Sequence, residues 1–257
     1  MKNQGFRKPH RMRRKKSILK NSFFWIALGI TILIFLLSYF LFFSDFFRIR
    51  NIEISGNQKT ETQIIENLIE RDKNIFLFNS EKNKENILNN IFQITQVGIN
   101  KKLPCILKIE IEEREPVAVV CQNECFYIDK QGMVFERTTE DGQIPKINNL
   151  NLQQDLKLGD KVLDEENLNQ ILIIESAFKK DLGILVGSME LASERRLNVF
   201  TSQGWQAYFD IQKDISWQIT ELKSILEKEI PLEKREKLKY IDLRFEKVYV
   251  FPESIFD

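Results

Sequence analysis

An unbroken apolar run near the N-terminus dominates the hydrophobic pattern of the chain. Residues 23–43 read FFWIALGITILIFLLSYFLFF and carry no charged side chain. As a helix with a rise of ~1.5 Å per residue, the run would span roughly 31 Å, which matches the hydrocarbon core of a bilayer. A buried core helix would normally show a polar face, and a cleaved signal peptide has a shorter apolar region and a small-residue cleavage site. The run therefore predicts one retained transmembrane helix.

Residues 46–115 switch between the hydrophobic periods of strands and helices. Strict alternation over 107–112 is typical of a half-buried strand, and Thr60 with Gln63 forms a capping box that indicates the start of a helix. The predicted elements are, in order, a strand at 47–54, a helix with Thr60 as its N-cap, a helix from Ser80, and strands at 94–100 and 107–112. This segment therefore has the order β-α-α-β-β.

Residues 116–257 are richer in strand signals and contain two predicted helices, one from about Asp164 and one that begins after the candidate N-cap Asp214. The predicted strands lie at 117–121, 126–128, 133–135, 184–191, 196–201, 204–211, 240–245 and 248–251. Four aromatic residues are spaced as core residues: Trp205, Tyr208, Phe209 and Trp217. Strands and helices in this arrangement indicate an α+β fold with a mixed C-terminal β domain.

Charge is distributed unevenly along the 257 residues, although the formal net charge is only +1. Residues 1–22 hold nine Lys and Arg and no acidic residue, whereas residues 44–257 carry a net charge of −8. The positive-inside rule then places the N-terminus in the cytoplasm and residues 44–257 outside. A basic tail is also compatible with binding to nucleic acid or anionic lipid. Topology explains the tail without any partner, so we expect no nucleic-acid partner.

The residue types outside the membrane limit the available chemistry. The only histidine, His10, lies in the basic tail, so residues 44–257 lack Ser-His-Asp or Cys-His catalysis and His-ligated metal sites. The chain has no glycine-rich phosphate loop. Carboxylates are abundant, but nothing in the pattern distinguishes a catalytic pair from a solvated surface. We therefore assign no catalytic, cofactor-binding or metal-binding residue and expect a binding module with no small-molecule substrate.

Three cysteines lie in the segment predicted to be external, where disulfides are permitted. Cys121 and Cys125 flank a three-residue loop between two apolar runs and would face each other in a hairpin. A bridge across so short a loop contributes little chain entropy and has demanding geometry. Buried free thiols are the alternative, and a metal site does not suit the uneven spacing that includes Cys105.

Three local motifs, in this order, resemble the bacterial cell-division proteins of the FtsQ/DivIB family. The first is similar to the opening strand and turn of a POTRA domain, the second to the stretch that joins POTRA to the β domain, and the third to a late strand of that domain. The matching residues are IEISGN at 52–57 with Thr60, IEIEEREPVA at 109–118 followed by YID at 127–129 and GMVF at 132–135, and YIDLRF at 240–245.

The resemblance implies four segments along the chain. They are a cytoplasmic basic tail at 1–22, a transmembrane helix at 23–43, a POTRA domain at 46–115 and a β domain at 116–257. It also implies a non-catalytic scaffold in the cell membrane at the division septum, where it would coordinate septal wall synthesis without an enzymatic activity of its own.

Partners implied by the resemblance are the division proteins FtsB (DivIC) and FtsL, with FtsB bound by strand addition beside the last strand. Carried onto this chain, the site comprises Arg244, Phe245, Glu246, Lys247, Val248, Tyr249, Val250 and Phe251. Independently, the β-prone residues 248–251 would suit an exposed sheet edge that recruits an extended peptide, and Arg244 would offer its fork to a partner carboxylate. The alternative is a fully paired final strand with Arg244 in a structural ion pair.

Two functions from other classes compete with the scaffold. One is a POTRA-containing component of an envelope transport or assembly complex, for which we would expect tandem POTRA repeats or a C-terminal β-barrel. The other is an anchored cell-wall enzyme that uses a carboxylate, which would require an acidic cleft.

Overall fold

The computed structural model describes residues 22–139, 144–148 and 155–255, so the predicted basic tail with His10 lies outside the described residues. The chain divides into two compact units. The first holds the described residues up to Glu53 with 70–80 and 100–108, and the second holds 54–69, 81–99 and the remainder from Ile109. Helices combine with a three-stranded and a nine-stranded sheet, which confirms the predicted α+β class.

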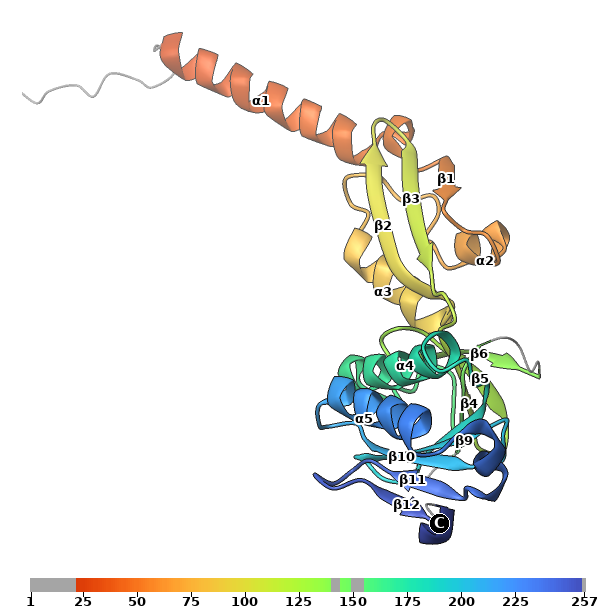
Figure 1. Ribbon diagram of the computed structural model, residues 1–257. Coiled ribbons are helices and arrows are strands. Elements are labelled where there is room, and N and C mark those ends of the chain that lie inside the picture. Colours follow the sequence, from red (N-terminus) through yellow and green to blue (C-terminus); the bar gives the residue numbers. More distant parts are fainter. Residues whose placement is uncertain (1–21, 140–143, 149–154, 256–257) are drawn as a thin grey trace, which may run out of the picture. The chain divides into compact units, whose positions relative to one another are not determined.

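Helix α1 (Ser22–Phe43) is the predicted apolar helix, and none of its residues is buried against the rest of the chain (Figure 1). It is the one helix in the described part of the chain that is long and apolar enough to cross a membrane. Because a soluble protein would have to leave this whole surface exposed to water, α1 fits a single-pass membrane anchor.

The segment after α1 differs from the prediction. A strand was expected from residue 47, but a 3₁₀ turn η2 (Asp45–Phe47) comes first and β1 spans Asn51–Ser55. The Oγ of Ser44 caps the turn by accepting a hydrogen bond from the Phe46 N–H at 3.2 Å. The apolar residue Phe47 therefore belongs to a turn, and the alternating hydrophobic pattern alone does not distinguish this turn from the start of a strand.

The three-stranded sheet has the order β1-β3-β2. Its chain order is β1, α2 (Thr62–Asn67), α3 (Ser80–Asn90), β2 (Ile94–Lys102) and β3 (Ile106–Glu113), which confirms β-α-α-β-β. Strand β3 buries Leu107, Ile109 and Ile111 on one face, as its alternation predicted. The turn after β1 requires glycine, because Gly56 has a φ of 90° and a Cβ there would lie 2.1 Å from the Ile111 carbonyl oxygen.

The entry to α2 is held differently from the predicted capping box. Glu61 is the N-cap instead of Thr60, and its side chain makes no capping hydrogen bond. The acceptor comes instead from β3: one oxygen of Glu113 accepts from the Thr60 N–H at 2.8 Å and the other from the Lys59 N–H at 2.9 Å. The capping box prediction was wrong because a carboxylate 53 residues away accepts from the Thr60 N–H, the donor that the Gln63 side chain would have engaged.

The nine-stranded sheet has the order β12-β11-β10-β9-β8-β7-β4-β5-β6. It is mixed, since β10–β11, β4–β7 and β7–β8 are parallel and the other described pairs are antiparallel. The strands are β4 (Ala118–Cys121), β5 (Cys125–Ile128), β6 (Val134–Thr138), β7 (Lys146–Asn148), β8 (Val186–Leu191), β9 (Arg196–Thr201), β10 (Gln206–Asp210), β11 (Tyr240–Asp242) and β12 (Tyr249–Phe251).

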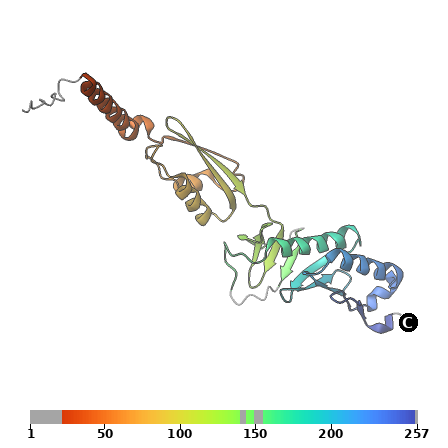
Figure 2. The ribbon, with the colours of Figure 1, turned by 90° about the vertical axis from the view of Figure 1, so that its left-hand side faces the viewer.

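Two helices lie side by side on one face of this sheet (Figures 1 and 2). Both predicted helix starts and the predicted N-cap Asp214 are confirmed: Asp164 accepts from the Asn167 N–H before α4 (Glu165–Lys180), and Asp214 accepts from the Trp217 N–H before α5 (Ile215–Lys228). Each aspartate satisfies a main-chain donor that the first helical turn leaves free. The caps therefore fix where both helices start over the sheet.

The core prediction for the aromatic residues is confirmed only in part. Trp205 and Phe209 are fully buried and pack around Phe178 of α4. Trp217 is 38% exposed, because it lies off the apolar stripe of α5. Tyr208 is half-buried and lies on the face of β10 opposite to Phe209, as adjacent strand residues must.

Several short elements were not predicted, among them one strand and one 3₁₀ helix of the nine-stranded domain. Strand β7 has three residues and joins the sheet through parallel pairs with β4 and β8. The 3₁₀ helix η3 (Leu232–Lys237) follows Pro231 and buries no residue. Elements this short have too few positions to show a hydrophobic period.

Cys121 and Cys125 form a disulfide, so the bridged alternative holds for this pair and Cys105 remains a free thiol. The two residues lie directly opposite each other in the β4–β5 hairpin, with their Cα atoms 4.2 Å apart. The bridge therefore closes the turn at the end of a strand pair that is already hydrogen-bonded.

We expect Glu113→Gln to lower the free energy of unfolding by about 1 kcal/mol at pH 7, because it removes the charge from a pair of hydrogen bonds at a half-buried site. Burial disfavours the Glu113 carboxylate, but the hydrogen bonds from Thr60 and Lys59 outweigh it, so the pKa of Glu113 lies below its ordinary value. A lowered pKa stabilises the fold above the unfolded-state pKa, and this stabilisation is lost as the pH falls through the folded-state pKa.

Urea unfolding of the full chain in mild detergent at pH 7 and at about pH 3 measures this difference, since an unperturbed Glu titrates near ~4.3. The gap between wild type and variant should shrink at the lower pH. Glu112→Gln, on the exposed neighbouring position of β3, is the matched control and should behave as wild type. A gap that is equal at both pH values would contradict the role of the Glu113 charge.

Candidate partner-binding edge

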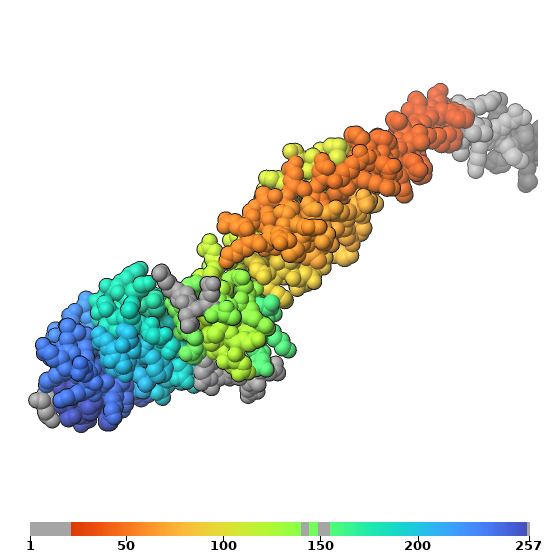
Figure 3. Space-filling view, turned by 90° about the vertical axis from the view of Figure 1, so that its right-hand side faces the viewer, coloured from red at the N-terminus to blue at the C-terminus, as the bar shows by residue number. Residues whose placement is uncertain are grey.

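Strand β12 is an edge strand of the nine-stranded sheet. It pairs with β11 in antiparallel register, with Tyr249 opposite Asp242 and Phe251 opposite Tyr240. Among the described residues no strand pairs with its other side. Figure 3 shows the C-terminal residues, in dark blue, at the molecular surface.

The main-chain groups of Val250 point away from β11. The Phe251 carbonyl oxygen accepts a hydrogen bond from the Lys239 N–H at 2.9 Å, so it faces the β11 side. Main-chain groups of successive residues in a strand point to opposite sides, so the N–H and C=O of Val250 face the free edge. One donor and one acceptor are therefore available there for an added strand.

The side chains of β12 divide between two faces. Val250 lies opposite Ile241 and packs against the core of the sheet. Tyr249 and Phe251 face solvent and are 50% and 43% exposed. The Phe251 ring stacks on Tyr240 with 5.3 Å between ring centroids, and Tyr240 stacks on Tyr208 at 5.2 Å. The outer face of the last three strands is thus an aromatic row.

Cationic side chains lie over the aromatic row. The Lys239 ammonium is 5.6 Å from the Phe251 ring centroid, and the Arg196 guanidinium is 4.4 Å from that of Tyr208. Lys247 lies 6.0 Å from the Tyr249 ring centroid. Cations over ring faces hold the aromatic side chains in place and give this face positive charge.

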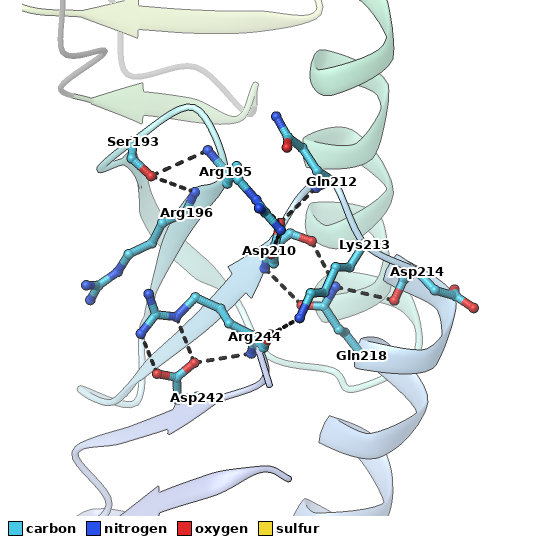
Figure 4. A network of polar contacts seen from close by, with 10 residues as sticks. All are labelled: Ser193, Arg195, Arg196, Asp210, Gln212, Lys213, Asp214, Gln218, Asp242 and Arg244. Carbon is cyan, nitrogen blue, oxygen red and sulfur yellow. Dashed lines mark hydrogen bonds and ion pairs between the residues drawn. The ribbon is translucent and has the colours of Figure 1, made fainter. Parts of the chain in front are cut away.

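Arg244 is engaged by Asp242. Its Nε donates to Asp242 Oδ1 at 2.8 Å and its Nη2 donates to Oδ2 at 2.6 Å (Figure 4). The hydrogen bond to Asp242 raises the pKa of Arg244 above its ordinary value. The side chains are 26% and 10% exposed, so the pair lies at the surface and is partly shielded from water. The fork that was expected to be open to a partner is therefore held in a structural ion pair.

The segment between β11 and β12 is tied to the loop between β10 and α5, and further polar contacts hold the two ends of that loop (Figure 4). The Lys213 ammonium donates to the Arg244 carbonyl oxygen at 2.7 Å. Before α5, Asp210 accepts from Arg195 at 2.7 Å, and its main chain exchanges two hydrogen bonds of 2.9 Å with the buried amide of Gln218. These contacts fix the point from which residues 245–248 reach the edge strand.

The eight residues predicted for partner binding form one continuous segment around this edge. Phe245, Glu246 and Lys247 are exposed, and Val248 packs partly against the core. Sequence reasoning missed Tyr208, Lys239 and Tyr240, which contribute to the same face. The signal available for Tyr240 was the alternation of side chains along a strand. Tyr240 and Asp242 flank Ile241, which is fully buried, so their side chains lie on the opposite, outer face.

Within the described ranges, no group of three or more His, Cys, Asp or Glu side chains is placed to hold a metal ion. At β12 the structure combines outward-facing main-chain groups, an aromatic face and surrounding cations, which are the features that addition of a peptide strand requires.

Two family models match the chain. The POTRA domain, FtsQ-type, matches residues 47–114, and the C-terminal domain of the cell division protein FtsQ/DivIB matches residues 118–244. Together they cover the three-stranded sheet and the nine-stranded sheet as far as the end of the Asp242–Arg244 pair.

Similar curated proteins include the cell division protein DivIB of Clostridium acetobutylicum, 27% identical over 161 residues, which are 60% of this chain and 64% of the relative. DivIB of Clostridium botulinum strain Hall is 37% identical over 106 residues, 40% of this chain and 41% of the relative. The cell division protein FtsQ of Rickettsia bellii is 30% identical over 97 residues, 37% of this chain and 36% of the relative. The chain thus matches less than two thirds of the length of each.

We expect Asp242→Asn to loosen the segment before β12, because it removes the charge that holds the Arg244 fork. The loss should be about 1 kcal/mol after allowance for partial exposure, or roughly fivefold faster amide exchange over residues 243–249. Hydrogen–deuterium exchange of the full chain in detergent measures it. Glu236→Gln, an exposed carboxylate in η3, is the control and should leave exchange unchanged. Unchanged exchange in Asp242→Asn would contradict the holding role of the pair.

Proposed function

Since the chain belongs to the FtsQ/DivIB family of bacterial cell-division proteins, we propose that it is a membrane-anchored, non-catalytic scaffold of the divisome. In this role it binds other division proteins at the septum and so coordinates septal wall synthesis. The observation that carries the proposal is the free edge of β12, which lies beside the region matched by the family's C-terminal model.

Helix α1 anchors the scaffold in the cell membrane with its N-terminus in the cytoplasm. The nine Lys and Arg before the helix support this orientation through the positive-inside rule. Residues 44–257, with a net charge of −8, then face the extracytoplasmic partners.

The partner FtsB (DivIC), together with FtsL, adds a strand of FtsB alongside β12. The main-chain groups of Val250 supply the hydrogen bonds, and Tyr249 and Phe251 give side-chain contacts on the outer face. Such a division of roles is typical of strand addition, in which main-chain bonds give affinity and alternate side chains give specificity.

Arg244 has a different role from the one first expected of it. Because Asp242 occupies its Nε and Nη2, Arg244 mainly positions residues 245–248. Its Nη1 makes no hydrogen bond with the described residues and remains the nitrogen that a partner carboxylate would meet.

Family membership favours this function over the two competing ones. A wall enzyme or an envelope transport component would have to be built on a fold that this family uses for cell division. The geometry of the β12 edge suits binding of a peptide strand better than catalysis.

We expect Val250→Pro to abolish capture of FtsB (DivIC) in a pull-down with the full chain in detergent. Proline removes the main-chain N–H that faces the free edge and that an added strand would need. Because that N–H is not bonded to β11, the domain should stay folded, which far-UV circular dichroism checks.

Val250→Ile is the matched control, because it keeps the N–H and the β-branched side chain that packs on the core. It should bind as wild type. Capture by Val250→Pro at the wild-type level would reject strand addition at this edge.

Depletion of the protein from growing cells should block septation and produce filaments, as visible by microscopy. Expression of the wild-type chain or of Val250→Ile should restore division, whereas Val250→Pro should not. Normal division in depleted cells would reject the scaffold role itself, independently of how partners are bound.

A further inference from the structure

An apolar surface lies in the first compact unit at the C-terminal end of α1. Phe46, Phe76, Leu77 and Leu103 form this membrane-proximal surface, with exposed fractions of 57%, 41%, 62% and 58%. They come from three segments: η2, the loop before α3, and the β2–β3 turn. Scattered exposed apolar residues are ordinary, but a group of large ones from separate segments indicates an interaction surface.

Direct contacts fix the loop before α3 to the end of α1. The side-chain amide of Asn74, which is buried, donates to the carbonyl oxygens of Leu41 at 2.8 Å and Phe42 at 3.1 Å. These carbonyls belong to the last turn of the helix and would otherwise lack partners. The Asn74 Oδ1 accepts from the Phe76 N–H at 2.9 Å. A single side chain thus joins the helix end to the position of Phe76.

Ring contacts continue the connection. Phe76 lies 6.3 Å from Phe42 of α1 and 5.2 Å from Phe47 of η2, measured between ring centroids. Phe46 in turn lies 5.1 Å from Phe47. The exposed rings are therefore continuous with the apolar surface of α1.

The β2–β3 turn belongs to the same end of the unit and lies next to the C-terminal end of α1 (Figures 1 and 2). The Cys105 carbonyl oxygen accepts from the Arg50 N–H at 3.0 Å. The Lys101 ammonium donates to the Phe78 carbonyl oxygen at 2.6 Å. These bonds hold Leu103 at the tip of a turn that is anchored on both sides.

Positive charge surrounds the apolar residues. Residues 44–53, 70–80 and 100–108 hold seven Lys and Arg and four Asp and Glu, a net charge of +3. Since residues 44–257 carry −8, the second compact unit carries −11. Lys101 and Lys102 are both exposed beside Leu103. The sign of the charge therefore changes from one unit to the other.

We propose that the membrane-proximal surface is embedded in the headgroup layer of the bilayer that α1 spans, and that anionic lipid headgroups bind its Lys and Arg side chains. Large apolar side chains next to cations are the composition of segments that lie in the membrane interface. The surface begins where the transmembrane helix ends, so it reaches this layer without a linker. The inference rests on the membrane span of the proposed function.

Fluorescence quenching in vesicles tests the proposal with the full chain. In a Cys105→Ser background, Leu77→Cys gives one reactive thiol, because Cys121 and Cys125 are bridged. An environment-sensitive fluorophore attached at position 77 of this variant should be quenched by lipids that carry a nitroxide at the headgroup. Leu185→Cys in the same background is the matched control, since Leu185 is similarly exposed at 65% but belongs to the second unit. It should not be quenched.

Two further comparisons separate lipid binding from an effect of the fluorophore. Phe46→Asp together with Leu103→Asp should reduce quenching at position 77 to the level at position 185. Adding phosphatidylglycerol to phosphatidylcholine vesicles should increase quenching at position 77, and Lys102→Glu should remove that increase.

The outcomes distinguish this inference from the anchor on which it rests. Quenching of Trp25 by lipids brominated along their acyl chains reports whether α1 lies in the bilayer. If Trp25 is quenched while positions 77 and 185 are equally unquenched, the membrane-proximal surface is free for a protein and the inference is overturned. If Trp25 is not quenched, the membrane anchor itself is rejected.

Discussion

Main-chain donors and acceptors in a folded chain need hydrogen-bond partners. In a sheet that is not closed, each edge strand has a row of N–H and C=O groups without a partner in the sheet. The nine-stranded sheet has two edge strands, β6 and β12, and at β12 the main-chain groups of Val250 face outward. The surrounding structure keeps that edge in place: Ile241 and Val250 pack on the core, and Asp242 holds Arg244 just before the segment that leads to β12. The candidate function follows from what this fold leaves unpaired.

Sequence patterns predicted those parts of the fold that depend on local chemistry. Asp164 and Asp214 start helices because a carboxylate satisfies free N–H groups two or three residues away. Alternation placed Leu107, Ile109 and Ile111 on one buried face. The edge segment was identified through its resemblance to a family, whereas the residues alone favoured a fully paired last strand. Its β-prone residues are compatible with either arrangement.

The parts that sequence did not predict depend on partners distant along the chain. Glu113 replaces the local capping box at Thr60 because folding brings β3 beside the start of α2. Strand β7 is formed by parallel pairing with β4 and β8, and its three residues are too few for a sequence pattern to predict it. Arg244 is the local exception: it was expected to be open to a partner, but the carboxylate of Asp242, two residues earlier, lies within reach of its guanidinium once β11 is extended. In each case the local pattern was compatible with the result and did not determine it.

A three-residue edge strand offers few main-chain hydrogen bonds, so these alone would give a partner little affinity and no selectivity. Short edges also protect a sheet from pairing with unrelated strands. Selectivity must therefore come from the side chains beside the edge, where Tyr208, Tyr240 and Phe251 form a stacked row with cations over the rings. Such a face favours a partner strand that carries acidic and apolar residues on alternate positions. Its acidic side chains would neutralise the cations over the aromatic row, and its apolar side chains, on the opposite face, would pack beside Val250.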